Sequence, residues 1–158
     1  MDAGVAVGAD RIQGESLRSA LIGTWRLLSW EAVRAEGGVQ RPFGAGPLGY
    51  LVYTDAGRML TTISRAGRAS IGGDLLTGPE AGRAVAFASF VAYSGTFSVV
   101  GEHVLHHVEM SLFPDWVGTT QRRRVEIDAL ARLLVLRPEV IPGSGAVEHV
   151  LRWERVQA

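Results

Sequence analysis

Residues capable of acid–base chemistry are concentrated between His106 and Arg123. This stretch contains the adjacent histidines His106 and His107, the carboxylate Glu109, and Gln121 two residues before Arg123. A histidine can move a proton near neutral pH, and arginine and glutamine can stabilise a developing oxyanion. The combination suits either recognition of an oxygen-bearing small molecule or proton transfer on one.

Strand geometry decides which of these groups meet. Successive side chains on a strand point to opposite faces, and partners across a hairpin share a face. The sequence Val100-Gly101-Glu102-His103 indicates a tight hairpin, which pairs Phe97 with His106. The apolar face, which we expect to point inward, then carries Phe97, Val99, Val104, His106, Val108 and Met110.

The following strand can be sorted in the same way. If Val125 and Ile127 point inward, Gln121 and Arg123 do as well. A buried arginine needs a partner, because an uncompensated charge inside a protein costs on the order of several kcal/mol. We therefore expect His106 to be the acid–base group of an apolar cavity, with ligand contacts from Gln121, Arg123, Tyr93, Trp116, Phe97 and Met110.

The elements that position these residues are mostly short strands. We expect a hairpin at Gly49–Ser64 with Gly57 in its turn, and one helix that starts at Pro79 after a Thr77 cap and ends at Gly95. Seven or more strands with one helix favour an all-β closed antiparallel barrel of about 8–10 strands, with the helix packed at its mouth. The other expected strands are Thr24–Ala35, Thr96–Val100, His103–Phe113, Gly118–Asp128, Leu133–Arg137 and Val147–Val156.

The composition excludes several classes of protein. The chain has 158 residues, is 47% hydrophobic and carries equal numbers of acidic and basic residues. This predicts one domain and gives no electrostatic reason to expect nucleic acid or a membrane as partner. Every basic side chain is arginine and there is no cysteine, so lysine Schiff bases, P-loops, thiol catalysis and disulfides are excluded.

The first sixteen residues are small and polar, without a basic or strongly apolar run. We interpret residues 1–16 as a disordered tail and residues 17–158 as the domain. Nothing in the tail is typical of a signal peptide, and no stretch approaches the roughly 20 apolar residues of a membrane helix. The sequence therefore predicts a cytoplasmic protein.

The motif Gly23-Thr24-Trp25 on the first strand and Trp153-Glu154-Arg155 on the last resemble the calycin superfamily. The resemblance implies that Trp25 closes the barrel floor and stacks on Arg155, with Arg152 the weaker candidate. Such a stack is physically reasonable, because it covers a ring face while leaving the guanidinium donors free. We expect this pair to be structural.

More specifically, the chain resembles the small bacterial and fungal lipocalin-like domain family over residues 17–156. The matching segments are Leu21–Leu27, Gly49–Met59, Ala92–Phe97, His106–Arg123 and Leu151–Arg155. The resemblance implies a single-domain barrel with an internal cavity, often encoded among enzymes of natural-product or aromatic metabolism. The absence of cysteines and the expected absence of a signal sequence distinguish the chain from secreted lipocalins.

Each candidate site residue also has a purely structural interpretation. His106 could be a satisfied core residue, and Arg123 could bind carbonyls at the barrel end or pair with Glu31 or Glu154. Trp116 would lie at the rim, where it could cap the cavity or only cover its edge. Tyr93, at the end of the expected helix, could be a lid contact or a packed side chain with a wet hydroxyl.

The opposite strand face carries His107, Glu109 and Ser111 and is most simply a solvated exterior. If that face lined the cavity instead, His107 and Glu109 would be an oriented acid–base pair. We expect no metal or other cofactor. His103 and His107 share a face but lie about 13 Å apart along the strand, too far for one ion.

The leading functional hypothesis is binding of a hydrophobic, partly oxygenated small molecule, aromatic or polyketide-like, in the cavity. The alternative is a cofactor-independent cyclase, isomerase or dehydratase of natural-product biosynthesis, in which His106 moves a proton and Arg123 with Gln121 stabilises an enolate. A third possibility is a filled barrel that only binds other proteins. A homodimer is possible.

Overall fold

The computed structural model describes residues 14–128, 132–139 and 147–157. Most of the expected N-terminal tail, residues 1–13, lies outside this part. The described chain begins with helix α1 (Gly14–Leu21). A second helix, α2 (Glu80–Ala88), and a 3-10 turn, η1 (Pro114–Trp116), interrupt the strands. The strands are β1 (Gly23–Arg34), β2 (Val39–Gln40), β3 (Leu48–Tyr53), β4 (Arg58–Ser64), β5 (Phe90–Val100), β6 (His103–Ser111), β7 (Thr120–Asp128), β8 (Leu133–Pro138) and β9 (Val147–Arg155).

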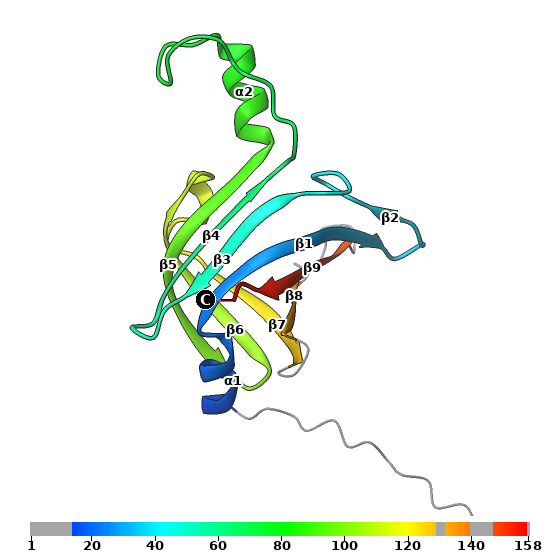
Figure 1. Cartoon of the computed structure of the whole chain (residues 1–158), viewed down its shortest axis with the longest axis vertical. Helices are drawn as coiled ribbons and strands as arrows, with labels where there is room; N and C mark the ends of the chain where they lie inside the picture. Colours follow the sequence, from blue (N-terminus) through cyan, green and yellow to red (C-terminus); the bar gives the residue numbers. More distant parts are fainter. Residues whose placement is uncertain (1–13, 129–131, 140–146, 158) are drawn as a thin grey trace, which may run out of the picture.

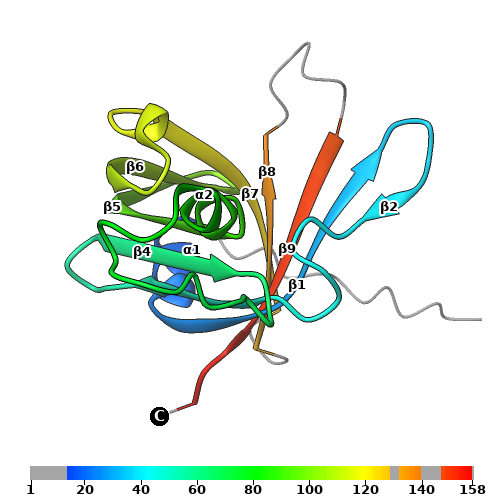
Figure 2. The same cartoon turned by 90° about the horizontal axis from the view of Figure 1, so that it is seen from above.

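The strands form the closed antiparallel barrel that the sequence predicts. Neighbours along the chain pair from β3 through β9, and β1 pairs with both β3 and β9, which closes the barrel. The short strand β2 adds to the outer part of β1 and extends away from the barrel (Figures 1 and 2). Closure removes the exposed sheet edges that an open sheet would have to protect.

Helix α1 closes one end of the barrel (Figure 1). Its Leu17 and Leu21 are buried, and they pack with Trp25 in the core. The guanidinium of Arg155 lies 4.2 Å from the centre of the Trp25 ring, and the two residues are paired across β1 and β9. Arg155 also donates hydrogen bonds to the carbonyls of Ala20 and Ile22. This is the closure expected for Trp25 and Arg155, and it ties α1 to the last strand.

Helix α2 stands above the other end of the barrel, where it contacts β5 (Figures 1 and 2). None of its residues is buried. The expected helix end at Gly95 is wrong: the helix stops at Ala88, and β5 begins at Phe90. From Val91 onward, alternate residues turn inward, so burial in the barrel decides the structure of this segment. The expectation that Thr77 caps this helix is also wrong, because Pro79 is the N-cap residue and no side-chain hydrogen bond caps the helix.

The hairpin between β5 and β6 has the predicted register at its tip, with Val100 opposite His103 and Phe97 opposite His106. The register then shifts between Gly95 and Ser94, where Glu109 is the extra residue of a β-bulge. Past the bulge Met110 pairs with Ser94 and is 69% exposed. The expectation that Met110 lines the cavity is therefore wrong.

Gly95 is required at the bulge. A Cβ on this residue would lie 1.9 Å from the carbonyl oxygen of His107, far inside the contact distance. Only glycine lets the two strands approach this closely, so the register shift is encoded at this position.

No helix in the described part of the chain is long and apolar enough to cross a membrane.

Candidate small-molecule site

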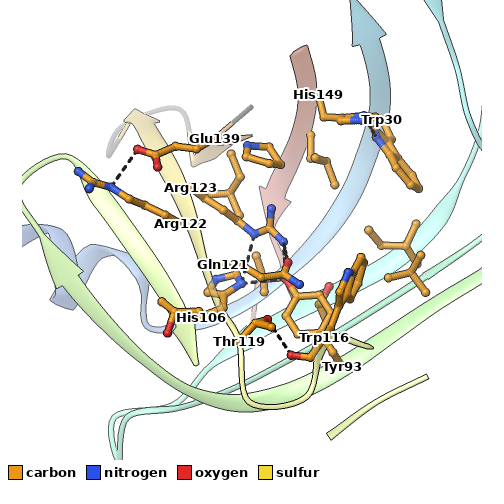
Figure 3. A pocket seen from close by; sticks show the side chains of 18 of the residues that line it. Trp30, Tyr93, His106, Trp116, Thr119, Gln121, Arg122, Arg123, Glu139 and His149 are labelled. Carbon is orange, nitrogen blue, oxygen red and sulfur yellow. Dashed lines mark hydrogen bonds and ion pairs between the residues drawn. The ribbon is translucent and has the colours of Figure 1, made fainter. Parts of the chain in front are cut away.

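A cavity of about 800 Å³ occupies the barrel beneath the α2 end. Its wall is mainly apolar, and many of its polar groups lie on the neighbouring strands β5, β6 and β7 (Figure 3). Much of the apolar lining comes from Leu51, Ile63, Val91, Leu136, Leu151 and Trp153. The aromatic and polar lining includes Trp30, Tyr93, His106, Trp116, Gln121, Arg123 and His149.

His106 points into the barrel from β6 and is 1% exposed. Both of its ring nitrogens are engaged by tyrosines: Nε2 lies 2.7 Å from the hydroxyl of Tyr53, and Nδ1 lies 2.8 Å from the hydroxyl of Tyr93. Arg123 Nε also donates to Nδ1, at 3.3 Å. Because Nδ1 accepts that bond, the ring proton of the neutral imidazole lies on Nε2 and is donated to Tyr53.

The environment keeps this histidine neutral. Burial lowers the pKa of His106 well below its usual 6.5, and the positive charge of Arg123 and the neighbouring His107 lower it further. Burial raises the pKa of Tyr53 well above 10, and the nearby Tyr93 adds to this effect while Arg123 opposes it. Tyr53 and His106 are therefore both uncharged.

Arg123 and Gln121 reach the cavity from alternate positions on β7, as the strand pattern predicts. Arg123 Nη2 donates to Gln121 Oε1 at 2.6 Å and to the Tyr93 hydroxyl at 2.9 Å. Gln121 and Tyr93 thus hold the guanidinium across the top of His106 (Figure 3). The expected alternative partners of Arg123 are engaged elsewhere, since Glu31 binds Arg152 and Glu154 binds Arg26.

Trp116 lies in η1, in edge-to-face contact with Tyr93 at a ring separation of 5.6 Å. It borders both the main cavity and a smaller apolar pocket of about 220 Å³ under α2, which also includes Phe87 and Phe113. On the other side of Arg123 and Gln121, Arg122 pairs with Glu139 at 3.0 Å (Figure 3). Trp116 thus separates the cavity from the apolar surface around α2.

Two groups in or beside the site were missed from the sequence. Tyr53 anchors His106, and His149 on β9 lines the cavity next to Trp30. Trp30 Nε1 donates to His149 Nδ1 at 3.0 Å, which leaves the imidazole proton on Nε2. Burial lowers the pKa of His149, and Arg123 contributes to this shift. Strand alternation could have found His149, because it is two residues from the inward-facing Leu151.

Three other candidate site residues lie outside the cavity wall. Phe97 is buried against Tyr53, at a ring distance of 4.7 Å, and is absent from the cavity wall. His107 points outward and lies 2.9 Å from Ser98 Oγ and 3.0 Å from Thr120 Oγ1. Glu109 is exposed and forms a bidentate ion pair with Arg58. His107 and Glu109 therefore do not form an acid–base pair in the lumen.

A metal is not suggested by the side chains that the structure describes, since no three His, Asp or Glu residues among them converge on one point. The polar cluster is instead a set of hydrogen-bond donors and acceptors around one arginine, set in an apolar wall. That arrangement is typical of a small-molecule binding site.

A lipocalin-like domain family matches residues 22–156, nearly the whole described barrel. The chain is also similar to the 4'-hydroxy-3'-methoxypropiophenone carrier protein ppsC of Aspergillus oryzae (strain ATCC 42149 / RIB 40). The two are 40% identical over 94 residues, which cover 54% of this chain and 84% of the relative.

Proposed function

Since the chain belongs to the lipocalin-like domain family, we propose that it binds and carries a small oxygenated aromatic molecule in its barrel cavity. The observation that carries the proposal is the cavity of about 800 Å³, in which Arg123, Gln121 and Tyr93 form one polar cluster in a mainly apolar wall. Ligand pockets in proteins usually have volumes of about 300–1,000 Å³ and the same division into apolar wall and few polar groups.

The named ligand of the relative has the matching chemistry. A hydroxy-methoxy aryl ketone has a flat apolar body with oxygen atoms at both ends. The aromatic rings of Trp30, Tyr93 and Trp116 offer contact surfaces for such a body. The polar cluster offers donors for its oxygen atoms.

The state of His106 favours binding over the alternative of a cyclase or isomerase. A general base must be able to reach a substrate proton. Here both ring nitrogens of His106 are already engaged by Tyr53 and Tyr93. We therefore propose that His106 organises the cluster, while Tyr93, Gln121 and Arg123 face the ligand.

The proposal is tested by titrating the purified protein with 4'-hydroxy-3'-methoxypropiophenone while tryptophan fluorescence and heat are recorded. We expect saturable binding of one molecule per barrel. A Leu136→Trp variant, which fills the cavity from β8, should lose binding. Leu133→Trp places the same side chain on the exposed face of the same strand and should bind normally.

Recovery of the ligand distinguishes carriage from catalysis. After incubation, a carried molecule should be extracted with unchanged mass and chromatographic retention. Conversion to an isomer or a dehydrated product by the wild-type protein, lost in Leu136→Trp, would support the enzyme instead. Absence of saturable binding would contradict the proposal.

A further inference from the structure

The guanidinium of Arg123 is incompletely used by the protein. Of its five N–H groups, the one on Nε is donated to His106 and the two on Nη2 are donated to Gln121 and Tyr93. The two N–H groups of Nη1 have no hydrogen-bond partner within residues 14–128, 132–139 and 147–157. Figure 3 shows that this nitrogen points away from His106 and Gln121, toward the side of the cavity where Trp30 and His149 lie.

The charge of Arg123 is also not balanced by the side chains around it. Within the described parts of the chain, no carboxylate lies within ion-pair distance of this guanidinium. Its hydrogen-bond partners Gln121, Tyr93 and His106 accept from it as neutral groups. The neighbouring Arg122 and Arg124 differ, because they face outward and pair with Glu139 and Glu102.

The titratable groups that face Arg123 do not change this balance. They are Tyr53 from β3, Tyr93 from β5, His106 from β6 and His149 from β9. Glu139 reaches the rim beyond β8, but its carboxylate lies 3.0 Å from Arg122 Nε and 3.5 Å from His103 Nε2. A half-buried arginine held by neutral partners attracts an anion, because a charge removed from water must be compensated.

We propose that the cavity binds its ligand as an oxyanion, with the negative oxygen on Arg123 Nη1. The ligand class is an acidic phenol, one with an electron-withdrawing carbonyl group conjugated through the ring. On entry the phenol O–H bond breaks, the proton passes to solvent, and the phenolate accepts a charge-assisted hydrogen bond from Arg123. This inference rests on the proposed function and adds the protonation state of the ligand to it.

The chemistry of such phenols makes the inference measurable. A carbonyl para to the hydroxyl spreads the negative charge over the ring, so the phenol ionises more readily than a simple phenol. The phenolate absorbs at longer wavelength than the neutral form. The absorption spectrum of the bound molecule therefore reports its protonation state directly.

The experiment records spectra of 4'-hydroxy-3'-methoxypropiophenone with and without saturating wild-type protein across a range of pH. We expect the bound molecule to ionise at least about one pH unit below the free molecule, a tenfold shift in the ionisation equilibrium. Arg123→Gln should abolish the shift and Arg123→Lys should keep part of it. Arg124→Gln, on the outer face of the same strand, should leave it unchanged. Circular dichroism and thermal unfolding check that each variant is folded.

A second probe tests the role of charge without any variant. The 3',4'-dimethoxy analogue cannot ionise, so we expect it to bind wild-type protein at least about tenfold more weakly at neutral pH. Saturable binding of the phenol with the spectrum of its neutral form would overturn the oxyanion and leave the proposed function intact. If neither probe binds, both the oxyanion proposal and the proposed function are overturned.

Discussion

The Tyr53 hydroxyl and His106 Nε2 lie 2.7 Å apart inside the barrel. These residues belong to β3 and β6, which are separated in the sheet by β4 and β5. Their hydrogen bond therefore spans the interior rather than running along the sheet. Because both side chains are about 1% exposed, this bond fixes the orientation of the imidazole and the position of its proton.

Replacing Tyr53 by phenylalanine should destabilise the protein. The change leaves the Nε2 proton of His106 without an acceptor, and an unsatisfied buried donor costs about 1–3 kcal/mol. Urea unfolding of Tyr53→Phe should show this loss. Tyr50→Phe on the same strand is the matched control, because Tyr50 is half exposed, and its effect should stay within about 0.5 kcal/mol. Equal effects of the two changes would contradict the role assigned to the Tyr53 hydroxyl.

Acid should destabilise the fold through His106. Its pKa is lowered in the folded protein and near 6.5 in the unfolded chain, so below pH 6.5 the unfolded chain binds a proton that the folded protein does not. The stabilisation is complete above pH 6.5 and is lost as the pH falls below that value. Between pH 7.5 and 5.5 this amounts to about 1.4 kcal/mol.

The measurement is the free energy of unfolding at the two pH values for wild-type protein and for His106→Gln. The glutamine does not titrate, so its loss between the two pH values should be smaller by about 1.4 kcal/mol. Carboxylates and His149 contribute equally to both proteins and cancel in the comparison. Identical pH dependence would show that His106 is not held neutral.

His149 should contribute to affinity at the far side of the cavity from Gln121. Its Nε2–H can donate to a ketone oxygen of a ligand whose phenolate lies on Arg123. His149→Phe should weaken binding of 4'-hydroxy-3'-methoxypropiophenone by about 2- to 10-fold, the value of one neutral hydrogen bond. The control probe is the analogue that keeps the ring hydroxyl and methoxy groups but has a propyl chain in place of the propanoyl group, so that it lacks the ketone. If its binding weakens equally, His149 acts through packing rather than through the ketone.

Gly95→Ala should disturb the bulge between β5 and β6. The added Cβ would overlap the His107 carbonyl oxygen, and relief requires movement of the backbone. We expect destabilisation of about 1–3 kcal/mol in thermal or urea unfolding. Gly46→Ala is the control, because a Cβ at Gly46 meets nothing within 4 Å and its φ lies outside the left-handed region. A neutral Gly95→Ala would mean that the register shift does not depend on this glycine.

The barrel and much of its inward face could be predicted because two-residue alternation and hairpin turns are local properties. Phe97, Val104, His106 and Val108 are all buried as that alternation requires. Met110 was misplaced because one inserted residue reverses the alternation beyond it. The insertion depends on close approach of two backbones at Gly95, which no periodicity in either strand reveals.

The polar cluster could be predicted only in part, for a related reason. Gln121 and Arg123 share one strand, so their common face follows from spacing alone. Tyr53 and His149 join them from β3 and β9, across the interior. Their meeting depends on how the barrel closes, which alternation within a strand does not specify. The homodimer and the cytoplasmic location stay predictions.

The pairing of β1 with β9 has a consequence for synthesis of the protein. The first strand made is completed by the last, with Trp25 opposite Arg155. Until the ribosome has released β9, β1 lacks this partner and the Trp25 ring lacks its guanidinium cover. The nascent chain therefore cannot close its barrel before β9 has left the ribosome, and until then the β9 side of β1 has no partner strand.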